Sequence, residues 1–214
     1  MNPVARFLRK RWFIHLLLCI PVFYVFVPVL QKDTEYFADP AKYLLEYFGL
    51  ASTYLFVAVS MITPLRKVFP KIAIFKSIAI HRRQIGVGVF FYALLHFLIY
   101  FPYTGSWSEF VKDWDKLFIL SGIVGFALLL LLAATSNNWS VRKLGGRNWK
   151  RIHRLAYLIM LLLIYHQATQ EKTGYRETAT VFAPLIILQT VRIAIYGKHA
   201  LKNRAKSDSA YSSS

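Results

Sequence analysis

The sequence predicts an all-α fold: an integral membrane bundle of six transmembrane helices with both termini in the cytoplasm. Hydrophobic residues make up 56% of the 214 residues, against about 45–50% in soluble domains, and only 17% are charged. The apolar residues are concentrated in six long runs that carry almost no charge, and the segments between these runs alternate between basic and acidic. These observations predict the class of fold, the number of helices and their direction.

The six apolar runs are the predicted helices. A bilayer core of ~30 Å is crossed by a helix of about 20 apolar residues, and five of the runs meet this length. The run at 155–170 has 16 residues, and Arg154 beside it can extend the span because its long side chain reaches the interface. Backbone amides in lipid must bond within the chain, so each run predicts a helix. The runs are residues 12–31, 47–65, 84–108, 117–141, 155–170 and 178–197.

The connecting segments give each helix its direction. Residues 1–11 are basic, 32–46 are mildly acidic, and 66–83 hold six basic residues and no acid. The alternation continues, since 109–116 is mildly acidic and 142–154 again holds six basic residues and no acid. Basic loops stay in the cytoplasm, so the chain is predicted to start inside and to cross at each run.

The net charge of +17 is therefore a consequence of topology. Of the 27 basic residues, 21 fall on the predicted inner side: four in 1–11, six in each basic loop, and five from Arg192 onward. A charge divided among four separate inner segments excludes a nucleic-acid partner and makes the lipid bilayer the partner. The predicted organisation is a cytoplasmic N-terminus at 1–11, a six-helix transmembrane domain at 12–197 and a disordered cytoplasmic tail at 198–214.

Two of the six histidines lie inside predicted spans, where an ionisable residue indicates function. His96 lies 13 residues beyond Arg83, or about 20 Å into the bilayer, and His166 lies 12 residues beyond Arg154, or about 18 Å. Both helices run from inside to outside, so the two imidazoles are predicted at nearly the same depth in the outer half of the membrane.

Two imidazoles at one depth, on two helices of a bundle, can ligate one haem iron axially. The alternative is a pair of histidines that hydrogen-bond to the backbone or to each other. The spacing alone favours the haem interpretation slightly over this alternative. His153, at the inner end of the fifth run, does not share a face with His166 on an ideal helix. A second, inner haem between His153 and His81 is an open alternative, as is an interfacial role for His153.

Three stretches resemble the MsrQ (YedZ) family of the ferric-reductase-like transmembrane superfamily. They combine an RRxxG sequence, the Leu-His of the third run, and an LG…W…HRL sequence followed by a later histidine. The resemblance covers most of the chain and agrees with the six-span plan. The stretches are ITPLRKVFP at 62–70, RRQIGVGVFFYALLHFLIYF at 82–101 and TSNNWSVRKLGGRNWKRIHRLAYLIMLLLIYH at 135–166.

The resemblance implies that 12–197 is a ferric-reductase-like domain in a bacterial inner membrane. It implies that His96 and His166 are the axial ligands of a b-type haem and that His153 is a further haem-associated residue. It also implies FMN as a cofactor, with electrons drawn from the quinone pool or from a reduced flavin. Those electrons would pass to a periplasmic molybdopterin reductase of the MsrP type, which repairs oxidised methionines in proteins.

The related NADPH oxidases place two histidines on each of two helices, whereas here the inner histidine of the third run is displaced to His81 or absent. One haem b is therefore expected, with a second as the alternative. On this interpretation the chain is an electron-transfer subunit rather than the catalytic subunit. The second candidate function is that of a stand-alone cytochrome b that reduces ferric iron or another external acceptor. The third candidate is a small carrier whose histidines relay protons or bind a metal ion.

Overall fold

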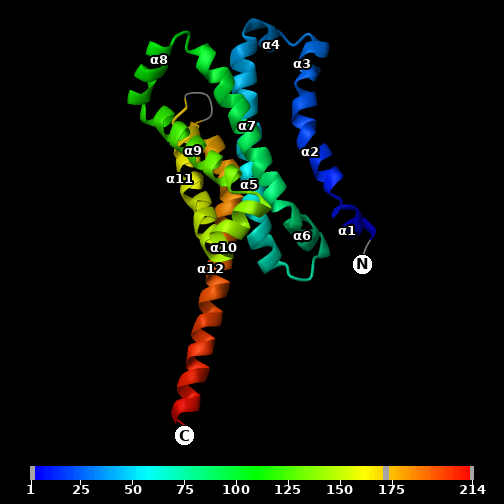
Figure 1. Ribbon diagram of the computed structural model, residues 1–214, viewed down its shortest axis with the longest axis vertical. Helices are drawn as coiled ribbons and strands as arrows, with labels where there is room; N and C mark the ends of the chain where they lie inside the picture. Colours follow the sequence, from blue (N-terminus) through cyan, green and yellow to red (C-terminus); the bar gives the residue numbers. More distant parts are fainter. Residues whose placement is uncertain (1–2, 171–173, 213–214) are drawn as a thin grey trace.

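The computed structural model describes residues 3–170 and 174–212, and these residues form helices joined by short turns (Figure 1). The α-helices are α1 (Pro3–Phe7), α2 (Arg11–Tyr24), α3 (Phe26–Gln31), α4 (Thr34–Ala38), α5 (Pro40–Val68), α6 (Ala73–Ile78), α7 (Arg82–Tyr103), α8 (Trp107–Lys112), α9 (Leu117–Ala134), α10 (Asn138–Ile152), α11 (Ala156–Ala168) and α12 (Gly174–Ser212). The 3₁₀ turns are η1 (Ala79–His81), η2 (Asp113–Asp115) and η3 (His153–Leu155).

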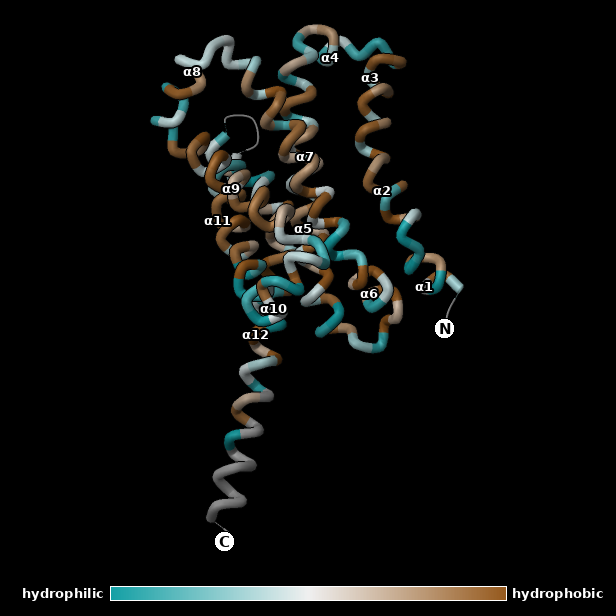
Figure 2. Tube along the Cα trace, viewed as in Figure 1, coloured by the Kyte–Doolittle hydropathy of each residue, from teal (hydrophilic) through white to brown (hydrophobic). Residues whose placement is uncertain are grey.

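Five segments in the described part of the chain are long and apolar enough to cross a membrane. Two of them join consecutive elements, since α2 continues into α3 and α6 continues through η1 into α7. Figure 2 shows the apolar residues along the central length of these helices and polar residues at the turns. The prediction of an all-α membrane bundle is therefore confirmed. The five segments are Arg11–Gln31, Pro40–Val68, Ala73–Tyr103, Leu117–Ala134 and Gly174–Lys198.

The predicted fifth span differs in length from the others. Its helix, α11, has 13 residues, or about 20 Å at a rise of about 1.5 Å per residue, which is short of a bilayer core of ~30 Å. The reason is local, because η3 interrupts the helical path before Ala156 and the helix ends at Ala168. α11 packs against α9 and α12, so it lies within the bundle.

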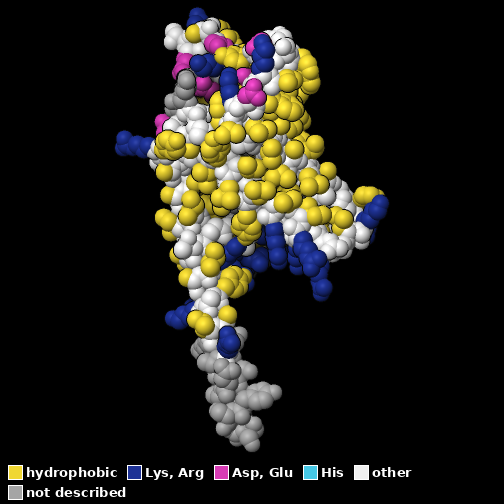
Figure 3. All heavy atoms as spheres, turned by 90° about the vertical axis from the view of Figure 1, so that its left-hand side faces the viewer, with side chains coloured by type: hydrophobic (Ala, Val, Ile, Leu, Met, Phe, Trp, Pro, Cys, Tyr) yellow, Lys and Arg dark blue, Asp and Glu magenta, His cyan; other side chains and the backbone are white. Residues whose placement is uncertain are grey.

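The ends of the bundle differ in charge. α1, α6, α10 and the far end of α12 lie at one end, and the α3–α4 turn and α8 lie at the other (Figure 1). In Figure 3 hydrophobic side chains cover the middle, Lys and Arg gather at the lower end, and Asp and Glu gather at the upper end with several Lys or Arg. The segments alternate between the two ends as the loop charges predict. That the basic end faces the cytoplasm remains a prediction.

Helix α5 holds the bundle together. The Asp39 carboxylate accepts a hydrogen bond from the Lys42 amide at 2.9 Å, and Pro40 occupies the first turn, so the helix starts with a side-chain cap and a pre-set φ. α5 then packs along α7 on one side and α12 on the other. Two clusters of buried side chains lie at these contacts, Phe56 with Val89 and Ile159, and Val57 with Phe182 and Leu185.

The C-terminal segment is helical where the sequence predicts a disordered tail from 198. Helix α12 continues to Ser212 and extends beyond α10 (Figure 1). Alanine, lysine and arginine, which recur after residue 198, are good helix formers, so a helix begun in the span can continue through them. Residues 1, 2, 213 and 214 of the predicted terminal segments lie outside the described residues.

Candidate functional site

A cavity of about 500 Å³ lies among α5, α7, α9 and α11. Its walls are mostly apolar, and both His96 and His166 line it. Polar residues from the ends of helices line it as well, namely Lys42, Glu46, Tyr103, Gln170 and Glu177. These helix ends belong to the α4 and α8 end of the bundle (Figure 1), so the polar part of the cavity faces away from the basic loops.

The two histidines are held in the same way by neighbouring helices. Nδ1 of His96 lies 2.8 Å from the carbonyl oxygen of Leu45 on α5, and Nδ1 of His166 lies 2.7 Å from that of Phe118 on α9. A carbonyl oxygen only accepts, so each Nδ1 donates and each Nε2 keeps its lone pair. Metal-ligating histidines typically donate their other N–H to a carbonyl or carboxylate in this manner.

Glycines allow the rings to reach these carbonyls. A Cβ on Gly49 of α5 would lie 2.9 Å from Nδ1 of His96, and one on Gly122 of α9 would lie 2.7 Å from Cε1 of His166. Both distances are shorter than side chains tolerate, so each ring packs directly on a backbone. Neither glycine carries a sequence signal that separates it from an ordinary glycine of helix packing.

The structure brings the two predicted ligands together. The ring centroids of His96 and His166 are 6.4 Å apart, with the ring planes at 87° to one another. Counting residues along the helices predicts the two histidines at equal depth, and in the structure both line the same cavity. The Gln170 side-chain amide lies 3.1 Å from Nε2 of His166, and donates to it.

A second glutamine in this cavity was not identified from the sequence. Gln167 is only 4% exposed, and neither atom of its amide has a hydrogen-bond partner among the described residues. Unpaired buried amides cost free energy, and an exception of this kind needs an explanation such as a ligand or a water. The nearest sequence signal is its position beside His166 in a run that is otherwise apolar.

His153 lies in a different environment from the other two histidines. Its ring stacks on Trp149, with centroids 3.9 Å apart, and its Nδ1 donates to the Trp149 carbonyl at 3.1 Å. The Ser136 hydroxyl lies 3.3 Å from Nε2. Burial lowers the pKa of His153, and the bond to Trp149 offsets part of that effect. His153 is not among the residues that line the cavity.

His81 is buried at the basic end of the bundle, at 1% exposure, and its Nε2 lies 3.0 Å from the Leu8 carbonyl oxygen. Its hydrogen-bond partner therefore belongs to the N-terminal segment, whereas the neighbours of His153 belong to α10 and to the turn before it. This arrangement gives no support to a second haem between His81 and His153.

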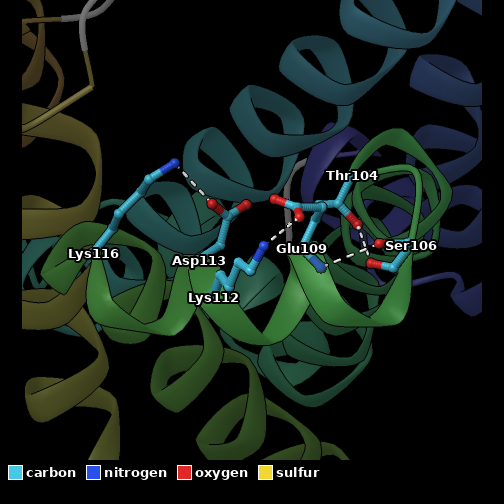
Figure 4. Close-up of polar contacts among 6 residues, drawn as sticks. All are labelled: Thr104, Ser106, Glu109, Lys112, Asp113 and Lys116. Carbon is cyan, nitrogen blue, oxygen red and sulfur yellow. Dashed lines mark hydrogen bonds and ion pairs between the residues drawn. The ribbon is translucent and has the colours of Figure 1, made fainter.

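The segment around α8 has its charges paired (Figure 4). Lys112 bonds Glu109 and Lys116 bonds Asp113, each at 2.7 Å, and the Ser106 hydroxyl caps α8 by accepting from the Glu109 amide. Hydrogen bonds from Lys116 and from the Tyr100 hydroxyl hold the pKa of Asp113 below its usual value. Two acidic residues of this loop, Glu109 and Asp113, are therefore each paired with a lysine.

Residues 48–164 match the family described as ferric reductase like transmembrane component. The chain is also similar to a protein-methionine-sulfoxide reductase heme-binding subunit, MsrQ, from Ralstonia nicotianae. The two are 33% identical over 170 residues, which is 77% of this chain and 76% of that protein.

Two magnetosome proteins named MamZ share part of the sequence. The one from Magnetospirillum gryphiswaldense is 38% identical over 155 residues, and the one from Paramagnetospirillum magneticum is 35% identical over 153. Each match covers 70% of this chain and 23% of the MamZ protein, so the chain spans about a quarter of their length. The family match covers more than half of the chain and the MsrQ match covers most of it. The chain therefore belongs to the ferric-reductase-like transmembrane family that includes the heme-binding subunit MsrQ.

Proposed function

We propose that the protein is the haem-binding membrane subunit of a methionine sulfoxide reductase system, and that it holds one b-type haem between His96 and His166. The observation that carries the proposal is the pair of imidazoles in one cavity, each with its Nδ1–H committed to a carbonyl. The similarity to MsrQ, which covers 77% of the chain, supports the same conclusion.

The residues present fit such a group. An imidazole nitrogen that ligates a metal lies about 2.0–2.1 Å from it, so two rings that held one metal between them would have centroids roughly 6 Å apart. The observed separation is 6.4 Å. The cavity of about 500 Å³ falls within the usual range for cofactor sites. The unpaired amide of Gln167 gives the cavity a hydrogen-bonding group that a bound cofactor can satisfy.

A haem in this cavity would supply a one-electron carrier inside the membrane. The chain's own residues supply the rest. Leu45 and Phe118 fix the two histidine tautomers through their carbonyls, and the apolar side chains around them exclude water. The Gln170 amide, which occupies Nε2 of His166 in this structure, must give up that bond when the nitrogen ligates a metal.

For the path of the electrons we propose a quinol or a reduced flavin as donor and a periplasmic MsrP-type molybdopterin reductase as acceptor, in a bacterial inner membrane. The polar residues of the cavity lie at the end of the bundle opposite the basic loops, which favours an acceptor on that side. FMN, the quinone and a role for His153 rest on the family resemblance alone.

A stand-alone reductase of ferric iron or of another external acceptor is the second candidate, favoured by the description of the matching family. The two differ in what reoxidises the reduced protein. A purified MsrP-type partner should accelerate reoxidation if the chain is an electron-transfer subunit, and a ferric chelate alone should do so if it is a self-contained reductase.

The test is the haem content and the optical spectrum of the purified protein in lipid nanodiscs. The proposal predicts one haem per chain with low-spin b-type bands, which His96→Ala and His166→Ala should each abolish or severely reduce. His15→Ala on the exposed face of α2 is the matched control and should retain both. Unchanged spectra and haem content in both cavity variants would reject the assignment.

A further inference from the structure

The cavity that His96 and His166 line continues along the bundle in both directions from the two rings. Toward the α4 and α8 end its lining reaches Tyr103, seven residues beyond His96, or about 10 Å at a rise of about 1.5 Å per residue. Toward the basic end it reaches Ile159, seven residues before His166, or again about 10 Å. A group held between the two histidines therefore has one edge toward each end of the cavity.

The part of the cavity nearer the basic end offers no partner to a charged group. Its lining among the described residues is uncharged, and includes Gly125, Leu129 and Ile159. The hydroxyls of Ser52 and Thr53 also line it, but each already donates its hydrogen to a backbone carbonyl at 3.0 Å. An ionised carboxylate placed there would lose its hydration without gaining a partner, at a large cost in free energy. This part of the cavity therefore suits an apolar edge.

The polar part of the cavity contains Lys42, the one lysine or arginine among the described lining residues. Lys42 lies one helical turn before Leu45 on α5, and the carbonyl of Leu45 is the one that holds His96. Within the described part of the chain, Lys42 has no acidic partner. It lies at the end opposite the basic loops, where the positive-inside rule does not favour a lysine. Topology alone therefore does not explain this residue.

The other polar groups beside Lys42 are of two kinds. The Tyr103 hydroxyl and the Gln170 amide can donate, and the Gln170 amide, once His166 ligates a metal through Nε2, can donate to a group beside that ring. Glu46 and Glu177 are carboxylates, which repel a further anion. The ammonium of Lys42 is therefore the group that allows an ionised carboxylate to be held in this part of the cavity.

A b-type haem carries two propionate groups along one edge and apolar methyl and vinyl groups along the others. We propose that the propionate edge points into the polar part of the cavity and that Lys42 binds a propionate through a charge-assisted hydrogen bond. The apolar edge then lies toward Thr53 and Ile159. This inference rests on the haem proposed above, and it adds the orientation of the group and the side chain that selects it. The propionate edge faces the end of the bundle where the electron acceptor is proposed.

The experiment compares iron protoporphyrin IX with its dimethyl ester, which lacks the two negative charges. The full chain, prepared without haem in nanodiscs, is titrated with each compound, and the ratio of the two affinities is the measured quantity. Lys42→Met should weaken haem binding by roughly five- to tenfold and leave ester binding nearly unchanged, because the ester has no carboxylate for the ammonium to bind. Lys42→Arg keeps the charge and should keep the wild-type ratio.

Lys32→Met is the matched control. It removes an exposed lysine at the same end of the bundle, at the turn between α3 and α4, and Lys32 does not line the cavity. The ratio should therefore stay at the wild-type value. In the haem-loaded proteins, the propionate vibrations of the resonance Raman spectrum should shift in Lys42→Met and not in Lys32→Met. If Lys42 acted only on folding, both affinities would fall alike and the vibrations would not move.

Three results would overturn the orientation. They are an equal loss of haem and ester binding in Lys42→Met, the same change of ratio in Lys32→Met, and a ratio in Lys42→Arg as low as that in Lys42→Met. Failure of the proposed function gives a different result, because neither compound would then produce a low-spin spectrum with the wild-type protein. In that case both the haem site and its orientation are rejected.

Discussion

Gly122→Ala should disturb His166 without weakening the helix that carries the change. The added Cβ would lie 2.7 Å from Cε1 and 2.8 Å from Nδ1 of His166, whereas ordinary contact begins at 3.4 Å. The ring must therefore retreat by about 0.7 Å, which exceeds the tolerance of about 0.5 Å typical of a binding site. The same ring carries the 2.7 Å bond to the Phe118 carbonyl, and retreat lengthens it.

The size of the effect follows from the cost of overpacking. An extra methyl group in a well-packed interior costs about 1–3 kcal/mol, which corresponds to a loss of roughly 5- to 150-fold in haem affinity if the ring shift falls on the ligation. Alanine is a better helix former than glycine by about 0.5–1 kcal/mol, so a loss of haem cannot come from a weaker α9.

The assay is haem titration of the purified protein, followed in the visible spectrum. Gly86→Ala on α7 is the matched control, because its Cβ would meet nothing within 4 Å. Gly122→Ala should weaken haem binding or shift the spectrum away from the low-spin form, and Gly86→Ala should do neither. Wild-type affinity and an unaltered spectrum in Gly122→Ala would refute the packing of His166 against α9.

Three further predictions concern groups around the site. Burial lowers the pKa of His153 below 6.5, so the unfolded chain binds the proton more tightly than the folded chain does. The contribution of His153 to the free energy of unfolding should be complete above pH 6.5 and should fall as the pH drops below it. Thermal unfolding from pH 7 to 5 should show this slope in the wild type and a smaller slope in His153→Gln. Tyr100→Phe removes one of the two hydrogen bonds that lower the pKa of Asp113, so an infrared titration of the carboxylate should show that pKa rising, with Lys116 still holding it below the usual value. Gln167→Leu removes a buried amide without partners, so denaturant unfolding should show the haem-free protein gaining about 1–3 kcal/mol and the haem-loaded protein gaining less.

The sequence predicts what depends on distance along a helix. Uncharged runs, loop charges and residue counts from Arg83 and Arg154 are enough to place the helices in a bundle and to put His96 and His166 at one depth. Each residue adds a fixed rise along a helix axis, so the depths of the two histidines in the membrane can be compared without knowing how the helices pack.

The rotation of each helix about its own axis is set by packing, so it cannot be obtained by counting residues. Gly49 and Gln167 are recognised as site residues only when the faces of α5 and α11 are known. The stacking of His153 on Trp149 is a partial exception, because a spacing of four residues places two side chains on one helical face. Arg154 marks the start of the short run in the sequence, but the turn at η3 and the end of α11 at Ala168 are seen only in the structure.

The same limit applies to the contact between the N-terminal segment and the start of α7. Arg11 and Arg83 are read from the sequence as residues of two basic inner segments, and topology alone accounts for them. The two segments meet at His81, whose Nε2 is hydrogen-bonded to the Leu8 carbonyl. A contact between residues 73 positions apart has no local sequence signature.

The central claim is that His96 and His166 ligate one haem, and chemical rescue tests it most directly. Each histidine is replaced by alanine in turn, and the electron paramagnetic resonance and visible spectra are recorded before and after free imidazole is added. Each variant should lose the low-spin signal of the wild type and regain it with imidazole, because the free ligand occupies the place of the missing side chain. A low-spin signal that survives both substitutions without imidazole would contradict the claim.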